Sequence, residues 1–230
     1  MKTIGLLGGM SWESTLTYYR LINEGVRERL GGLHSAELVL YSVDFEPMEA
    51  LQAAEDWEES GRVLARDAVR VEAAGADFLL ICTNTMHKVA DQVEAAIGIP
   101  LLHIADATGE ALTAAGHRRV GLLGTAFTME QDFYRGRLQE RYGLEVLVPG
   151  EADRQIVHRV IYEELCLGQI LEGSRQEYGR ILRALQDDGA EAVILGCTEI
   201  PLLVGKEDSP IPLCDTTSVH ARAAVDMALG

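Results

Sequence analysis

Two short stretches hold the side chains of this sequence that are best suited to acid–base chemistry. Residues 81–88 read ICTNTMHK and include Cys82 and Thr83, and residues 196–199 read GCTE and include Cys197 and Glu199. Each stretch follows an apolar run, where a buried strand is expected to end. A partly ionised thiol can abstract a proton, whereas a threonine hydroxyl is a poor base that can hold a water, donate a hydrogen bond or relay a proton.

The elements that position these side chains alternate along the chain. Near-continuous apolar runs predict strands buried on both faces. They cover residues 3–8, 36–43, 77–83, 100–104, 119–124, 144–149, 191–197 and 211–215. Helical spacing of apolar residues predicts helices over 14–30, 61–74, 155–167 and 174–186. Strands that alternate with helices are typical of parallel α/β units.

The two halves of the chain resemble each other in three segments that occur in the same order. Residues 4–11 (IGLLGGMS) match 120–128 (VGLLGTAFT), 75–85 match 189–199, and 97–108 match 209–219. The repeat predicts an α/β fold with two pseudo-symmetric domains, each a mostly parallel sheet flanked by helices. We expect the first domain to comprise 1–98 and 211–230, and the second to comprise 99–210.

The repeat also decides which residue of the first stretch corresponds to Cys197. When Gly75 is aligned with Gly189, Thr83 falls on Cys197 and Cys82 falls on Gly196. Side chains alternate along a strand, so a shift of one residue turns a group to the opposite face. If Cys197 faces a ligand, Thr83 should face it too, and Cys82 should point into the packing.

The expected ligand is a small carboxylate. Parallel sheets bind ligands at the carboxyl ends of their strands. There, the turns after the strands at 3–8 and 119–124 offer backbone N–H groups and the hydroxyls of Ser11, Thr125 and Thr128. Such donors suit a carboxylate. No GxGxxG follows the first strand, which argues against a dinucleotide site.

Composition excludes several other classes of function. The net charge of −16 over 230 residues argues against nucleic-acid binding. No apolar stretch approaches the ~20 residues of a membrane span, so we expect a cytoplasmic protein without a membrane partner. The four cysteines form neither a CxxC pair nor a zinc-like cluster with histidines, so no metal site and no disulfide framework are expected.

These residues resemble the cofactor-independent aspartate/glutamate racemase superfamily over essentially the whole length. The motifs LLGGMSWEST at the start, NT-M-H at 84–87, LLGT-FTM at 122–129 and GCTE at 196–199 carry the resemblance, with EQDFYRGRL and HIADAT in support. It implies an active site in an interdomain cleft, a homodimer, and catalysis without pyridoxal phosphate or metal. It also implies two cysteines, one removing the substrate's α-proton and the other returning a proton from the opposite face.

The sequence departs from this family pattern where the first cysteine should stand directly before the NT pair, because Thr83 occupies that position. We therefore identify the chain as an atypical Thr/Cys member with one active-site thiol, in which Cys197 and Thr83 are catalytic. A lysine that reads the side-chain carboxylate in many aspartate racemases is replaced by Cys166. The substrate-binding candidates are Met10, Ser11, Gln52 (in the loop after the second strand), Asn84, Thr85, Thr125, Thr128, Thr198 and Glu199.

The function that follows is racemisation of aspartate or glutamate, faster from the L-enantiomer because the cysteine of the second domain typically deprotonates that form. The superfamily also includes single-thiol decarboxylases of disubstituted malonates, hydantoin racemases and maleate isomerases. These remain alternatives, as does a carboxylate-binding protein without catalysis. The GCTE motif argues against the binding protein, because binding alone needs no thiol beside a carboxylate.

Overall fold

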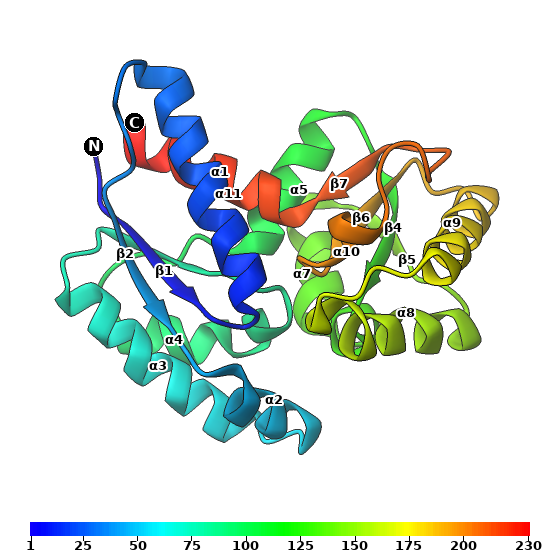
Figure 1. Cartoon of the computed structure of the whole chain (residues 1–230), viewed down its shortest axis with the longest axis horizontal. Helices are drawn as coiled ribbons and strands as arrows, with labels where there is room; N and C mark the ends of the chain where they lie inside the picture. The colour runs from blue at the N-terminus through cyan, green and yellow to red at the C-terminus, as the bar shows by residue number, and fades with distance from the viewer. The chain divides into compact units, whose positions relative to one another are not determined.

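Two separate parallel sheets organise the chain, as the repeat predicts. The computed structural model describes residues 1–230, which divide into two compact units. Unit 1 comprises residues 1–104 and 220–230, and unit 2 comprises residues 105–219. Figure 1 labels most of the helices and strands along the chain.

Unit 1 contains a sheet with strand order β2-β1-β3 in which every pairing is parallel. Its strands are β1 (Ile4–Gly8), β2 (Leu38–Ser42) and β3 (Phe78–Ile81). An isolated parallel bridge between Leu79 and Leu101 extends the sheet beyond β3. The helical elements are α1 (Trp12–Leu30), α2 (Phe45–Ala53), α3 (Trp57–Ala73), η1 (Thr85–Val89), α4 (Ala90–Ala96) and most of α11 (Thr216–Leu229).

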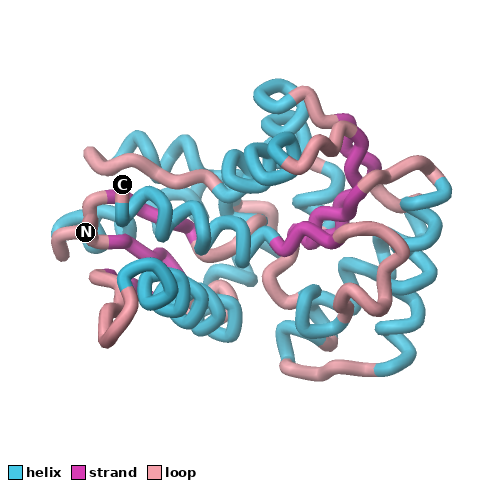
Figure 2. Tube along the Cα trace, turned by 90° about the horizontal axis from the view of Figure 1, so that it is seen from above, coloured by secondary structure: helices cyan, strands magenta, loops and turns pink.

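Unit 2 repeats this arrangement with a parallel sheet of order β5-β4-β6-β7. Its strands are β4 (Arg119–Gly124), β5 (Glu145–Leu147), β6 (Ala192–Gly196) and β7 (Leu213–Asp215). Its helical elements are α5 (Ile104–Ala114), α6 (Ala126–Glu130), α7 (Asp132–Tyr142), α8 (Glu151–Glu163), η2 (Leu165–Leu167), α9 (Glu172–Asp187) and α10 (Ile200–Leu203). Figure 2 shows helices and strands in contrasting colours.

Both faces of the unit 1 sheet are covered, which explains its near-continuous apolar strands. Successive residues of β3 alternate between two clusters: Phe78 and Leu80 pack with α1 and α11, whereas Leu79 and Ile81 pack with α2, α3 and α4. All four side chains are fully buried. The alternation follows from the two-residue period of a strand.

Hydrogen bonds confirm that the two halves are structural repeats. The carboxylate of Asp77 accepts from the backbone N–H of Thr3 before β1, and that of Glu191 accepts from the N–H groups of Arg118 and Arg119 at the start of β4. The next contact repeats as well. The N–H of Leu79 donates to the carbonyl of Pro100, and the N–H of Val193 donates to the carbonyl of Pro212, both at 2.9 Å.

The bounds of the two compact units differ from the expected ranges at both places where the chain passes from one unit to the other. Residues 99–104 lie with unit 1, since Leu101 bridges to Leu79. Residues 213–215, expected in the first domain, form β7 and pair with β6 of unit 2. The following helix α11 then packs Ala221, Ala224 and Val225 into the core of unit 1. These long-range exchanges leave no local signal in the sequence.

One expectation about a helix was wrong. Gln52 lies in α2 rather than in a loop, and Pro47 is tolerated there because it stands in the first turn. In α1 the buried stripe includes Tyr18, Ile22 and Val26. Trp12, Leu16 and Tyr19 of the same helix are 64%, 59% and 48% exposed. No helix of the chain is long and apolar enough to cross a membrane.

Candidate functional site

The predicted site residues gather at the carboxyl ends of the two parallel sheets. In unit 1, Met10 and Ser11 follow β1, and the stretch 83–85 follows β3. In unit 2, Thr125 and Thr128 follow β4, and the stretch 197–199 follows β6. Most of these side chains are buried, while Thr83 is partly exposed.

A network of hydrogen bonds orders the turn after β1. The Ser11 hydroxyl caps α1 by accepting from the N–H of Ser14 at 3.4 Å. The Thr15 hydroxyl donates to the carbonyl of Ser11 at 2.9 Å and accepts from the N–H of Gly9 at 2.8 Å. Gly9 has φ +92°, and a Cβ there would lie 2.3 Å from the carbonyl oxygen of Val43. The turn therefore requires glycine at this position.

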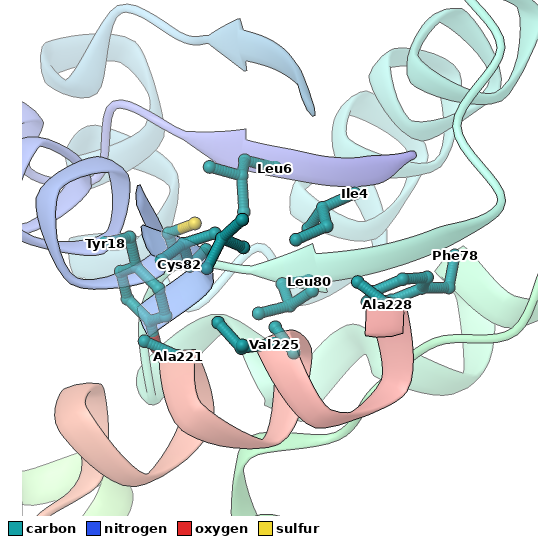
Figure 3. Close-up of a cluster of buried hydrophobic side chains, with 12 residues drawn as sticks. Ile4, Leu6, Tyr18, Phe78, Leu80, Cys82, Ala221, Val225 and Ala228 are labelled. Carbon is teal, nitrogen blue, oxygen red and sulfur yellow. The ribbon is translucent and has the colours of Figure 1, made fainter. Parts of the chain in front are cut away.

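Cys82 and Thr83, which follow β3, lie in different surroundings. Cys82 is fully buried in a cluster with Leu6, Tyr18 and Ala221 (Figure 3), as the repeat predicted. Burial raises the pKa of the Cys82 thiol well above its ordinary value, so this group stays protonated. The Ser14 hydroxyl donates to the Cys82 carbonyl at 3.2 Å and joins the start of α1 to this strand end.

Thr83 begins a tightly bonded segment. Its carbonyl lies 2.8 Å from Nδ1 of His87, and the N–H of His87 donates to the Asn84 carbonyl at 3.1 Å. Asn84 and Thr85 are 2% and 5% exposed. The side-chain amide of Gln52, itself 3% exposed, donates to Sδ of Met86 at 3.0 Å. Gln52 thus packs beneath this segment from α2.

The end of β6 holds the most distinctive chemical arrangement. The Cys197 thiol donates a hydrogen bond to Oε2 of Glu199 at 3.0 Å, and the Thr198 hydroxyl donates to the same oxygen at 2.8 Å. All three residues are buried. Burial and the neighbouring Glu199 carboxylate raise the pKa of Cys197 well above its ordinary value. A thiol bonded to a carboxylate in this way can release its proton to that carboxylate.

Both residues that follow Cys197 take part in this geometry. The carboxylate of Glu199, a residue expected to contact substrate, accepts a hydrogen bond from the thiol. Thr198 is directed to the same carboxylate. The GCTE motif contained the signal, since a carboxylate two residues after a thiol can curl back once the strand has ended. The motif alone does not show whether the carboxylate turns toward the thiol or toward a ligand.

The turn after β4 supplies hydroxyls in unit 2. The Thr125 hydroxyl caps α6 by accepting from the N–H of Thr128 at 3.4 Å, and the two hydroxyls lie 3.2 Å apart. Gly124 is opposite Gly196 in the sheet register, and a Cβ on Gly124 would lie 2.9 Å from the Gly196 carbonyl. This close approach packs the start of the Thr125 turn against the end of β6, next to Cys197.

Sequence reasoning missed Glu164, which orders the segment carrying Cys166. Glu164 is 7% exposed and accepts from the Ser174 hydroxyl at 2.5 Å and from Arg159 at 3.1 Å. Its backbone carbonyl accepts from the N–H groups of Leu167 and Gln169. Cys166 lies close enough to contribute to the raised pKa of Cys197. The acidic pair in IYEEL was the only signal for this residue in the sequence.

The cluster at the end of β6 has no metal-like character. No group of three or more His, Cys, Asp or Glu side chains in the chain is arranged to hold a metal ion. The thiol, the carboxylate and the surrounding hydroxyls at the end of β6 are groups that can transfer protons.

The chain is an α/β protein with two parallel sheets and a thiol–carboxylate pair at the end of β6. The sequence profile of the Asp/Glu/hydantoin racemase family matches residues 7–224. The chain belongs to this family, as the motifs indicated.

Similar structures and a similar sequence support this assignment over the full length of the chain. A Yersinia pestis crystal structure, described as a candidate Asp/Glu racemase, is 55% identical with a TM-score of 0.94 and 100% of both chains covered. An aspartate racemase homologue from Pyrococcus horikoshii OT3 is 37% identical with a TM-score of 0.86, also over 100% of both chains. The broad specificity amino-acid racemase RacX of Bacillus subtilis strain 168 is 24% identical, over 98% of each chain.

A more distant structure shows how widely the fold is used. A mutant of arylmalonate decarboxylase is 15% identical with a TM-score of 0.56, covering 99% of this chain and 94% of its own. At this identity the likeness concerns the fold alone.

Proposed function

We propose that this protein is an amino-acid racemase that moves the α-proton of aspartate or glutamate without a cofactor. The observation that carries the proposal is the buried thiol of Cys197, bonded at 3.0 Å to the Glu199 carboxylate at the end of β6. A thiol in this setting has both a proton to give and a neighbour to receive one. Membership of the racemase family supports the choice of reaction.

In this proposal the first step runs through the hydrogen bond between Cys197 and Glu199, because burial and that carboxylate raise the pKa of the thiol. Because the thiol is protonated at rest, it becomes a base only when Glu199 accepts its proton across the hydrogen bond. The resulting thiolate then takes the α-proton of the L-amino acid. The thiol is regenerated, the substrate becomes a carbanion, and Glu199 carries the original thiol proton until it returns it to solvent.

In this proposal Thr83, or a water that it holds, delivers a proton to the other face of the carbanion. The hydroxyl is then restored from solvent, so the net change is inversion alone. From the D-enantiomer the same group must act as the base, for which a threonine hydroxyl is poorly suited. We therefore expect faster initial turnover from the L-enantiomer, while the equilibrium between enantiomers is unchanged.

The remaining candidates serve substrate binding in this proposal. Ser11, Thr125 and Thr128 lie at strand-end turns rich in donors, where a carboxylate is stabilised. Met10, Asn84 and Thr85 lie at the same end of the unit 1 sheet, and Thr198 lies beside the thiol. Gln52 acts indirectly, through Met86. We assign Glu199 to the catalytic pair as well, because its carboxylate accepts a hydrogen bond from the Cys197 thiol.

A decarboxylase is the second candidate. Loss of carbon dioxide from a disubstituted malonate needs only one proton donor, and a thiol with a raised pKa suits that role. The presence of Thr83 where the family pattern has a second cysteine favours a one-thiol reaction. The arylmalonate decarboxylase fold is compatible with it.

The proposal extends to the setting of the enzyme. We propose a cytoplasmic homodimer in amino-acid metabolism that binds small amino acids and neither nucleic acid nor membranes. The net charge of −16 supports the absence of a nucleic-acid partner. Light scattering coupled to size exclusion tests the dimer, since a monomer mass at working concentration would contradict it.

The reaction is tested with purified protein in D₂O, without pyridoxal phosphate and after chelation of metals. Proton NMR should show loss of the α-proton signal of L-aspartate or L-glutamate, and chiral chromatography of the same samples should show the D-enantiomer appearing. Release of carbon dioxide from an α-aryl malonate, with no exchange of amino acids, would replace racemisation by decarboxylation. Thermal stabilisation by the amino acids with neither reaction would identify a binding protein.

A further inference from the structure

Three buried histidines gather behind the Thr83 segment in unit 1. His87, His103 and His220 are 2%, 3% and 0% exposed. The ring centroids of His87 and His103 lie 4.4 Å apart, and those of His87 and His220 lie 6.0 Å apart. Buried imidazoles require defined hydrogen-bond partners, so their contacts reveal what the cluster holds in place.

The contacts of His87 determine its tautomer. The backbone N–H of Ile104 can only donate, and it lies 3.2 Å from Nε2, which is therefore the accepting nitrogen. The proton is then on Nδ1, which donates to the Thr83 carbonyl at 2.8 Å. One neutral ring thus joins the first residue after β3 to Ile104 through two different bonds.

Ile104 lies at the point where the chain leaves unit 1. Ile104 is the last residue of unit 1 before the chain continues into unit 2. The chain returns at His220, the first residue of unit 1 after that excursion. Nε2 of His220 lies 2.8 Å from the Leu102 carbonyl, and its Nδ1 lies 2.8 Å from the Tyr18 hydroxyl. Both passages between the units are thereby anchored to the histidine cluster.

We propose that His87 is a positioning residue, which fixes the Thr83 segment against the Ile104 passage through the two nitrogens of a neutral imidazole. This inference rests on the proposed function, because it gives Thr83 its place relative to the reacting α-carbon. The ring holds the carbonyl of Thr83 and leaves its hydroxyl to the reaction. Misplacement of a reacting group by about 1 Å can slow a reaction by up to about 100-fold.

Substitution of His87 by asparagine or by glutamine tests its two hydrogen bonds one at a time. In His87→Asn, the amide nitrogen occupies a position close to Nδ1 and preserves the donor to the Thr83 carbonyl. In His87→Gln, the amide oxygen reaches the position of Nε2 and preserves the acceptor for Ile104, but the bond to Thr83 is lost. The matched control is His34→Asn, because His34 is exposed.

The test measures α-deuterium exchange separately from the L- and D-enantiomers. Exchange from L depends on Cys197, whereas exchange from D requires abstraction at Thr83. His87→Gln should raise the ratio of L- to D-exchange on the order of 10–100-fold. His87→Asn should leave the ratio within about threefold but lower the amide-exchange protection of Ile104, and His34→Asn should change neither.

Two outcomes overturn the inference and remain distinct from failure of the proposed function. If Thr83→Val raises the ratio but His87→Gln does not, Thr83 acts as proposed and His87 does not position it. If both His87 variants slow both directions equally, the histidine serves only general stability. If Thr83→Val itself leaves the ratio unchanged, the proposed role of Thr83 is wrong, and the inference about His87 falls with it.

Discussion

The ends of β3 and β6 are built on the same repeat and differ by the position of a single thiol. In β3 the cysteine is the earlier of two aligned positions, and Cys82 is buried with Tyr18 in an apolar cluster. In β6 the earlier position is Gly196, and Cys197 follows it. A Cβ on Gly196 would lie 2.8 Å from Leu122, so only the later position accepts a side chain freely. A shift of one residue in register thus separates a thiol that packs in an apolar cluster from a thiol that donates to a carboxylate.

The two thiols also differ in why they are protonated. Burial alone raises the pKa of Cys82. At Cys197, burial acts together with the Glu199 carboxylate, which both repels the thiolate and accepts the thiol proton in a hydrogen bond. Both thiols therefore have a raised pKa, and what distinguishes Cys197 is a proton acceptor within hydrogen-bond distance. On this difference we base the proposal that Cys197, and not Cys82, is catalytic.

The largest effect is expected at Cys197, the thiol that distinguishes the end of β6 from the end of β3. Cys197→Ala removes the only group that we assign to α-proton abstraction from the L-enantiomer. Exchange of that proton with D₂O should fall by about 10²–10⁴-fold, while binding of the amino acid persists. NMR exchange and calorimetric titration measure the two quantities. Near-normal exchange in this variant would end the catalytic assignment.

Unit 1 should also respond to acid through His220, for which unit 2 has no fully buried counterpart. Burial lowers the pKa of His220 from 6.5 to about 4. The unfolded chain therefore takes up this proton first as pH falls. Stability from this group is complete above pH about 6.5, is lost progressively down to pH about 4, and totals roughly 3 kcal/mol.

Urea unfolding of the whole chain at pH 7.5 and pH 5 measures this loss. His220→Gln should be less stable than the unmodified protein at pH 7.5, but should lose less of its stability on acidification. His34→Asn is the control, because an exposed histidine contributes little. Equal losses in all three proteins would exclude His220 as the source.

Glu199→Gln tests the difference between the two thiols, because it leaves the Cys197 thiol in place but removes the carboxylate that accepts its proton. Exchange from the L-enantiomer should fall by about 10–100-fold. At the same time the pKa of Cys197 should decrease, because the carboxylate no longer raises it. The rate of alkylation by iodoacetamide as a function of pH reports that change. An unchanged alkylation profile would show that Glu199 does not act on the thiol.

Thr83→Cys makes the two strand ends alike. A thiol at the aligned position should increase exchange from the D-enantiomer by about tenfold or more and leave exchange from the L-enantiomer nearly unchanged. Initial rates from each enantiomer decide the matter. A rise in both directions together would mean that residue 83 does not serve one face of the substrate.

Cys82→Ala is expected to have the smallest effect. It removes one buried sulfur from a packed cluster and should cost about 1 to 2 kcal/mol of stability, with little change in either exchange rate. Denaturant melts and NMR exchange on the same sample separate the two readouts. Loss of activity as severe as in Cys197→Ala would show that the register taken from the repeat is incorrect.

The sequence by itself determined much of the local arrangement. Strand and helix periods located the main elements, and the internal repeat set the register that buries Cys82 and aligns Thr83 with Cys197. These features are local because a strand's alternation is a property of neighbouring residues. The motifs likewise identified the family to which the chain belongs.

Only the tertiary structure decided the features that depend on distant residues or on side-chain direction. The sequence contained Glu199, but the folded chain turns its carboxylate onto the thiol. The hydrogen bond between His87 and Ile104 joins residues that lie 17 positions apart in the chain. Helix α11 contributes to the core of unit 1, although in the sequence it follows the whole of unit 2 except its own first residues. Such contacts arise because packing brings together groups whose meeting no local periodicity encodes.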